Sequence, residues 1–152
     1  MYMIKKRECG DCTLCCKLLD IPWMESLPNT YCSKCEINKG CTIFKSVPKK
    51  CLDYHCEYLK SETMGDELKP NVCNVIFEEI SKVIHLVLVD PDYIDAWKED
   101  TVMNYILKLN NNGVSVIISS YSNAPKIIFP TKGRTHEEVM SEVMDIYNNE
   151  YK

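Results

Sequence analysis

Apolar residues in the second half of the chain follow the periodicities of strands and helices. Residues 83–89 are a run of mostly β-branched and aliphatic side chains around His85, which predicts a buried strand. Residues 92–110 place their apolar side chains mostly on one helical face and predict an amphipathic helix. The Asn-Asn-Asn-Gly sequence at 110–113 should end that helix.

Two further strands and a final helix are predicted beyond this point. Residues 114–120 and 126–129 both have strand-like sequences, and a Ser-Asn-Ala-Pro turn at 122–125 indicates a hairpin between them. Thr135 and Glu138 match a capping box, and an apolar stripe (Val139, Met140, Val143, Met144 and Tyr147) follows it toward the C-terminus. The predicted order is therefore β-α-β-β-α.

The first half of the chain differs in composition and shows little apolar periodicity. All ten cysteines lie between Cys9 and Cys73, and the rest of the chain has none. Large apolar side chains are few here, and small units of this kind usually need disulfides or metals to fold. We therefore predict an α+β protein with an irregular, metal-stabilised, cysteine-rich unit over residues 1–74 and a small β-α-β-β-α unit over residues 75–152.

Bulk composition is that of a globular protein. Hydrophobic residues make up 45% of the chain and charged residues 26%. The longest apolar run, residues 83–89, is too short to span a bilayer, and the N-terminus lacks the apolar stretch of a secretory signal peptide. These features predict a cytoplasmic protein without a membrane partner, in a compartment where structural disulfides are rare.

The two parts of the chain also differ in charge. Residues 1–60 hold ten Lys/Arg and seven Asp/Glu, a formal +3, whereas residues 61–152 hold eight and fifteen, a formal −7. A basic first half would favour nucleic acid as a partner. However, a divalent ion held by four thiolates carries a net −2, so two such sites would reverse the sign. Nucleic-acid binding is therefore not expected.

Cysteine spacing is the main chemical signal in the sequence. A C-x2-C step lets two thiolates reach one ion, because the two intervening residues reverse the backbone. Three such steps and an adjacent pair of cysteines occur in the chain. The adjacent pair should serve two centres, or one of its thiols should be spare. The predicted metal ligands are Cys9, Cys12, Cys15, Cys16, Cys32, Cys35, Cys41, Cys51 and Cys56.

The ligand type fits more than one metal. Thiolates suit both Zn²⁺ and iron–sulfur clusters, and ten of them suffice for two zinc ions with four ligands each. The alternative is a [4Fe-4S] cluster, since Cys9, Cys12 and Cys15 match the first three ligands of a bacterial ferredoxin. A disulfide framework, thiol–disulfide exchange and simple burial are further alternatives, and burial applies most to the isolated Cys73.

The string C-G-D-C-T-L-C-C at residues 9–16 resembles the C-x2-C-x2-CC signature of the YkgJ-type cysteine-cluster family, described as zinc- or iron-chelating domains. Residues 40–56 are similar to that family's later block, and the resemblance covers roughly residues 9–74. It implies a chelating role for Cys12, Cys15, Cys16, Cys41, Cys51 and Cys56, with Cys32 or Cys35 between them.

The family also includes lysine methylases that act on flagellin, but this chain is short for one of those enzymes. Two arginines usual in the family are replaced by Val47 and Leu52 here, which argues against an anionic substrate.

The histidines and acidic residues suggest structural roles. We expect His55 and His136 at the surface, His85 in the core, and the acidic residues of 90–100 capping a helix and covering its wet face. No glycine-rich phosphate loop or hydrolase motif is present. The sequence therefore predicts a zinc-type metal-binding protein of this cysteine-cluster class, with structural ions and a partner-binding role, and it leaves catalytic activity undecided. The alternative is an iron–sulfur redox or methyl-transfer accessory protein.

Overall fold

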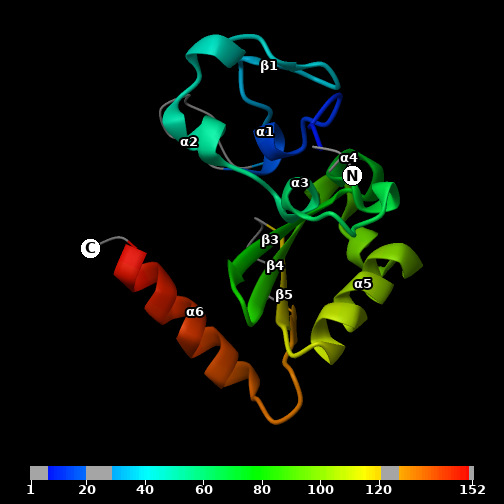
Figure 1. Ribbon diagram of the computed structural model, residues 1–152, viewed down its shortest axis with the longest axis vertical. Coiled ribbons are helices and arrows are strands. Elements are labelled where there is room, and N and C mark those ends of the chain that lie inside the picture. The colour runs from blue at the N-terminus through cyan, green and yellow to red at the C-terminus, as the bar shows by residue number, and fades with distance from the viewer. Residues whose placement is uncertain (1–6, 20–28, 121–126, 151–152) are drawn as a thin grey trace, which may run out of the picture.

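The computed structural model describes residues 7–19, 29–120 and 127–150, and it has both helices and sheets (Figure 1). Four strands form the main sheet in the order β3-β4-β5-β6, with bounds Val75–Ser81, Ile84–Val89, Ser115–Ser119 and Ile127–Phe129. The pairs β3–β4 and β5–β6 are antiparallel, whereas β4–β5 is parallel. The predicted α+β class is confirmed.

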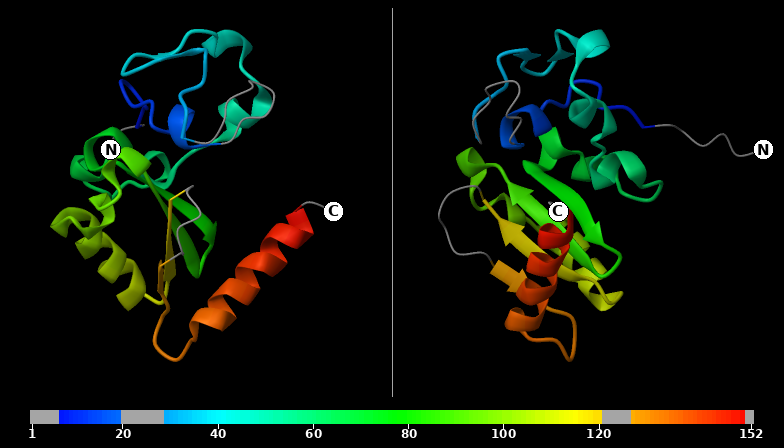
Figure 2. Two further views of the ribbon diagram at one scale, coloured as in Figure 1. Left: turned by 180° about the vertical axis from the view of Figure 1, so that it is seen from behind. Right: turned by 90° about the vertical axis from the view of Figure 1, so that its left-hand side faces the viewer.

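Helices α5 (Asp100–Asn111) and α6 (His136–Glu150) lie on opposite faces of this sheet (Figures 1 and 2). Val139 and Val143 of α6 pack against Ile84 and Ile117 on one face. Val102 and Ile106 of α5 belong to the larger cluster on the other face. The sheet is therefore buried on both sides, as its nearly continuous apolar strands predict.

Strand β3 is absent from the predicted order, which is wrong in this respect. The observed order in the second half is β-β-α-β-β-α. Val75, Ile76 and Phe77 are all buried, so the start of this strand lacks the alternation of a half-buried strand. The apolar pattern alone therefore does not reveal the hairpin that β3 forms with β4.

The helix predicted over residues 92–110 is also too long at its start. Two 3-10 turns, η4 (Pro91–Tyr93) and η5 (Ala96–Lys98), precede α5. The side chain of Asp90 accepts a hydrogen bond from the backbone N–H of Asp92, and the extended conformation of Glu99 separates η5 from α5. Local polar bonds at the strand end thus compete with the apolar periodicity.

The main apolar cluster draws on both sides of residue 74. Leu14, Leu18, Tyr58, Met64 and Leu68 of the first half are buried in it. They share this cluster with the buried side chains of β3 and with others from β4, β5 and α5. The division into units at 74/75 stays a prediction, but the two parts have one continuous core in the described residues. None of the described helices has the length and hydropathy needed to cross a membrane.

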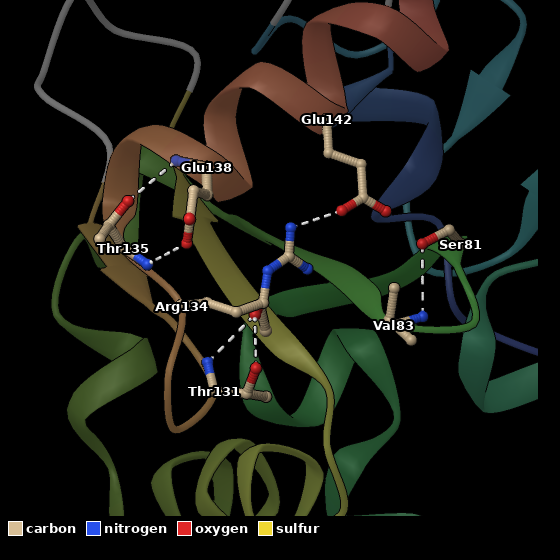
Figure 3. Close-up of polar contacts among 8 residues, drawn as sticks. Ser81, Val83, Thr131, Arg134, Thr135, Glu138 and Glu142 are labelled. Carbon is tan, nitrogen blue, oxygen red and sulfur yellow. Dashed lines mark hydrogen bonds and ion pairs between the residues drawn. The ribbon is translucent and has the colours of Figure 1, made fainter.

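The predicted capping box at the start of α6 is confirmed (Figure 3). The backbone N–H of Glu138 donates to Thr135 Oγ1 over 3.2 Å, and the N–H of Thr135 donates to Glu138 Oε2 over 2.8 Å. Later in α6, Met144 and Tyr147 of the predicted apolar stripe are exposed. The turn predicted at 122–125 lies outside the described residues.

We expect Thr135→Ala to lower the free energy of unfolding by about 1 kcal/mol, because it removes the side-chain acceptor for an N–H at the helix start. Urea unfolding followed by circular dichroism measures this change. Ser141→Ala, at an exposed position inside α6, is the matched control and should cost nothing, because alanine is the better helix former. Equal losses in the two variants would contradict the prediction.

Candidate metal centre

The cysteine-rich segment lies at one end of the main sheet and consists of short elements (Figures 1 and 2). Among the described side chains of residues 29–53, only that of Cys32 is buried. This stretch therefore has almost no apolar core of its own. Its elements are β1 (Cys35–Glu36), β2 (Gly40–Cys41), η2 (Phe44–Ser46) and α2 (Lys49–Asp53), with α1 (Cys15–Leu18) before them and α3 (Glu57–Lys60) after them.

All ten cysteines lie in the described residues and all are free thiols. The disulfide framework considered from the sequence has no support in the structure. The thiols gather into two groups, which the sequence did not predict. In each group, neighbouring thiols raise the pKa of some members, since two negative charges close together are unfavourable.

The first group contains Cys9, Cys12, Cys56 and Cys73. The backbone N–H of Cys12 donates to the carbonyl of Cys9 over 2.9 Å, which closes the turn of their C-x2-C step. Burial raises the pKa of Cys9, and the Cys56 and Cys12 thiols raise it further. Burial raises the pKa of Cys73 to about 11, and Cys12 and Cys56 again add to the shift. These four thiols are therefore electrostatic neighbours.

The second group contains Cys16, Cys32, Cys35, Cys41 and Cys51. The N–H of Cys32 donates to the carbonyl of Cys16 and that of Cys35 to the carbonyl of Cys32, both over 2.9 Å. Cys35 faces Cys41 across the β1–β2 pair. Burial, followed by the thiols of Cys16, Cys32 and Cys41, raises the pKa of Cys51. Three separate chain segments thus bring their thiols to one place.

The Cys15–Cys16 pair lies between the two groups. Cys15 packs against the main apolar cluster, whereas Cys16 interacts with Cys35. A hydrogen bond with Cys15 is the main cause that raises the pKa of Cys16, with burial second. Cys9 of the first group also interacts with Cys16. The expectation that the two adjacent thiols differ in role stays a prediction.

The thiols do not surround an ion position as they stand. Within the described ranges, no three His, Cys, Asp or Glu side chains are arranged to hold one metal ion. The predicted ligand set therefore stays a prediction, and the side chains would have to rearrange to complete each site.

The chemistry of both groups nevertheless fits a metal cation. Their soft thiol donors match the ligands of Zn²⁺. The backbone N–H of Lys34 donates to Cys32 Sγ over 3.5 Å. Burial, followed by the neighbouring thiol of Cys16, raises the pKa of Cys35 to about 12. Metal ligation requires deprotonated thiols, and a bound cation would offset the cost of placing their negative charges close together.

The histidines lie outside both groups. His55 is exposed, with Nδ1 3.0 Å from the carbonyl oxygen of Asp53. His85 is buried, as predicted, and its Nδ1 lies 2.9 Å from Glu57 Oε2, although the two atoms are not aligned as a hydrogen bond. Tyr105 donates to the other oxygen of Glu57 over 2.7 Å. His136 is exposed, as expected.

Sequence reasoning missed one buried ion pair beside the cysteine groups. Lys17 Nζ lies 2.7 Å from Asp90 Oδ1 and also contacts Asp92. Both Lys17 and Asp90 are buried. Lys17 stands directly between Cys16 and Leu18, so this pair ties α1 to the end of β4. In the sequence, Lys17 follows two cysteines and precedes two leucines, and this pattern does not indicate which acidic residue it pairs with.

A cavity of about 650 Å³ lies between α4 (Pro70–Cys73) and the segment of residues 92–102, and Cys73 is part of its wall. Other wall residues are Glu67, Val72, Tyr93, Ile94 and Glu99. The cavity therefore reaches the first cysteine group from the side of the sheet.

Comparisons with family models, with curated proteins and with solved structures give no match for this chain. The resemblance to the YkgJ-type family therefore rests on the cysteine spacing alone.

Proposed function

We propose that this protein binds zinc-type metal ions through its cysteines and that these ions hold the cysteine-rich segment together. One observation carries the proposal: residues 29–53 bury only Cys32 among their described side chains, yet they bring thiols from separate elements into one group. Apolar burial is the dominant favourable term in folding, and this stretch lacks it. Metal–thiolate bonds are the cross-links that its composition provides.

The energetic scale of zinc binding supports a structural role. Fixing one residue's backbone costs about 1–2 kcal/mol. Structural zinc in small domains contributes about 10–16 kcal/mol of apparent binding free energy at neutral pH. Such a contribution would offset much of the ordering cost of a short segment. The protein partner predicted from the sequence stays a prediction.

Metal analysis of anaerobically purified protein, with its visible spectrum, tests the proposal. We expect about two zinc ions per chain and no visible absorbance, since Zn²⁺ has a filled d shell. Refolding in Mg²⁺ instead of Zn²⁺ is the control and should leave the protein without bound metal, because Mg²⁺ prefers oxygen ligands. A brown protein with stoichiometric iron and sulfide would favour the iron–sulfur alternative. A folded, colourless and metal-free protein would overturn both.

A further inference from the structure

We propose that Cys9, Cys12, Cys56 and Cys73 form a metal site of their own, separate from that of the second group, and that Cys73 is the ligand that completes it. This inference rests on the proposed function and deepens it. It adds a ligand that the cysteine spacing did not identify and divides the thiols between two ions.

An ion pair joins the start of α4, the helix that ends in Cys73, to the first C-x2-C step. Lys69, the residue before α4, places Nζ 2.6 Å from Asp11 Oδ1, and Asp11 lies inside the step. Gly10, with φ +56°, faces the same ammonium group, which lies 3.6 Å from where its Cβ would be. The turn that carries Cys9 and Cys12 is therefore held against the beginning of the helix that ends in Cys73.

Cys56 reaches the same place from α3. It is the N-cap residue of α3, and its backbone carbonyl accepts a hydrogen bond from the N–H of Leu59 over 3.1 Å. Helix α3 packs against β3, which begins two residues after Cys73. Cys12, Cys56 and Cys73 all belong to, or pack against, the same apolar cluster. Three chain segments thus deliver four thiols to one end of β3.

The neighbours of each thiol close this set. Cys73 interacts with Cys12 and Cys56, Cys56 interacts with Cys12, and Cys9 interacts with both Cys56 and Cys12. Cys9 also interacts with Cys16 of the second group, more weakly than with Cys56 and Cys12. Four thiolates are the usual complement of a structural zinc site.

The second group has enough ligands without Cys73. Cys16, Cys32, Cys35, Cys41 and Cys51 supply five thiols, and Cys15 lies between the groups. Each group also contains one C-x2-C step, Cys9–Cys12 in the first and Cys32–Cys35 in the second. Two sites with separate ligands therefore account for the thiols better than one shared cluster.

The first site is also open to solvent on two sides. Cys9 is exposed, and Cys73 lines the 650 Å³ cavity beside α4. A metal ion therefore has an entry path to the site, which a plausible metal site requires.

The test is metal stoichiometry by native mass spectrometry, with Co²⁺ substitution to report thiolate ligation. Relative to the unchanged protein, Cys73→Ser should lose one of two ions and about half of the thiolate-to-cobalt absorbance. Cys32→Ser/Cys35→Ser should lose the other ion. Val72→Ala, at an exposed position beside Cys73 in α4, is the matched control and should keep both. If Cys73→Ser keeps both ions and the full absorbance, the inference is overturned while the proposed function stands.

A second measurement uses the unchanged protein, in case Cys73→Ser does not fold. Alkylation of the zinc-loaded protein is followed residue by residue during stepwise chelation. Cys73 should become reactive together with Cys9, Cys12 and Cys56. If Cys73 reacts while the other three are protected, it is not bound with them and the inference fails. If it stays protected after they have reacted, its burial alone explains its behaviour and the inference fails as well. If no metal binds at all, the proposed function itself fails.

Discussion

Chelation of the bound metal is expected to remove the hydrogen-exchange protection of residues 29–53 while the strands β3, β4 and β5 keep theirs. The reason is the uneven distribution of buried side chains. Residues 29–53 bury only Cys32 among their described side chains, whereas the main sheet is covered by apolar clusters on both faces. The segment without a core should depend on the ions, and the sheet should not.

Hydrogen-exchange mass spectrometry with and without a chelator, under reducing conditions, makes this comparison. Amides such as those of Cys35, Lys39 and Thr42, which donate to backbone carbonyls of the same segment, are the ones to follow. We expect their protection to fall to that of an unfolded chain. Local opening of this kind is independent of global unfolding when a segment has few buried apolar contacts.

Restoring Zn²⁺ should restore the protection, and adding Mg²⁺ should not, because thiolates select the softer ion. If the protection of residues 29–53 survives complete metal removal, the segment is held by something other than the ions, and the structural role proposed above is wrong. If β3–β5 also exchange freely, the ions support the whole fold and not the segment alone.

The sequence predicted the elements whose apolar pattern is simple. Strand β4, the β5–β6 hairpin and the start of α6 follow from β-branched runs and from the capping box of Thr135 and Glu138. Strand β3 was missed because its buried residues are consecutive. The start of α5 was misplaced because the side chain of Asp90 holds a tight turn that apolar periodicity does not reveal.

The cysteine spacing identified the kind of chemistry but not its arrangement. C-x2-C steps indicate which thiols are close in the chain, and so Cys9 with Cys12 was predictable. That Cys56 and Cys73 join them depends on the packing of α3 and α4 around β3 and on the Lys69–Asp11 bridge. Contacts of this kind join residues far apart in sequence, and no local pattern encodes them.

The Lys17–Asp90 pair is the same kind of contact, and it supports the second large prediction. Lys17 is 6% exposed and Asp90 3%, and their charged atoms are 2.7 Å apart. Burial works to lower the pKa of Lys17, but its bonds to Asp90 and Asp92 outweigh that effect and raise the pKa. Because the folded-state pKa is raised, the pair contributes fully below the pKa of an unfolded lysine. Its contribution should be lost as the pH rises above that value.

Lys17→Met should lower the free energy of unfolding by about 3–5 kcal/mol, because it leaves the Asp90 carboxylate buried without its cation. Chemical unfolding in excess Zn²⁺ measures this, so that metal occupancy stays constant although Lys17 adjoins Cys16. Lys39→Met is the matched control: Lys39 pairs with Glu36 at the surface, and an exposed pair contributes only about 0–1 kcal/mol.

The double variant Lys17→Met/Asp90→Asn separates the unpaired charge from the lost packing. Asparagine keeps an oxygen that can accept from the backbone N–H of Asp92, and it carries no charge to leave unpaired. We expect it to recover a substantial part of the stability lost in Lys17→Met. If instead the double variant is no more stable than Lys17→Met, the cost comes from the lost packing of the aliphatic part of the Lys17 side chain. The buried carboxylate would then not require its partner.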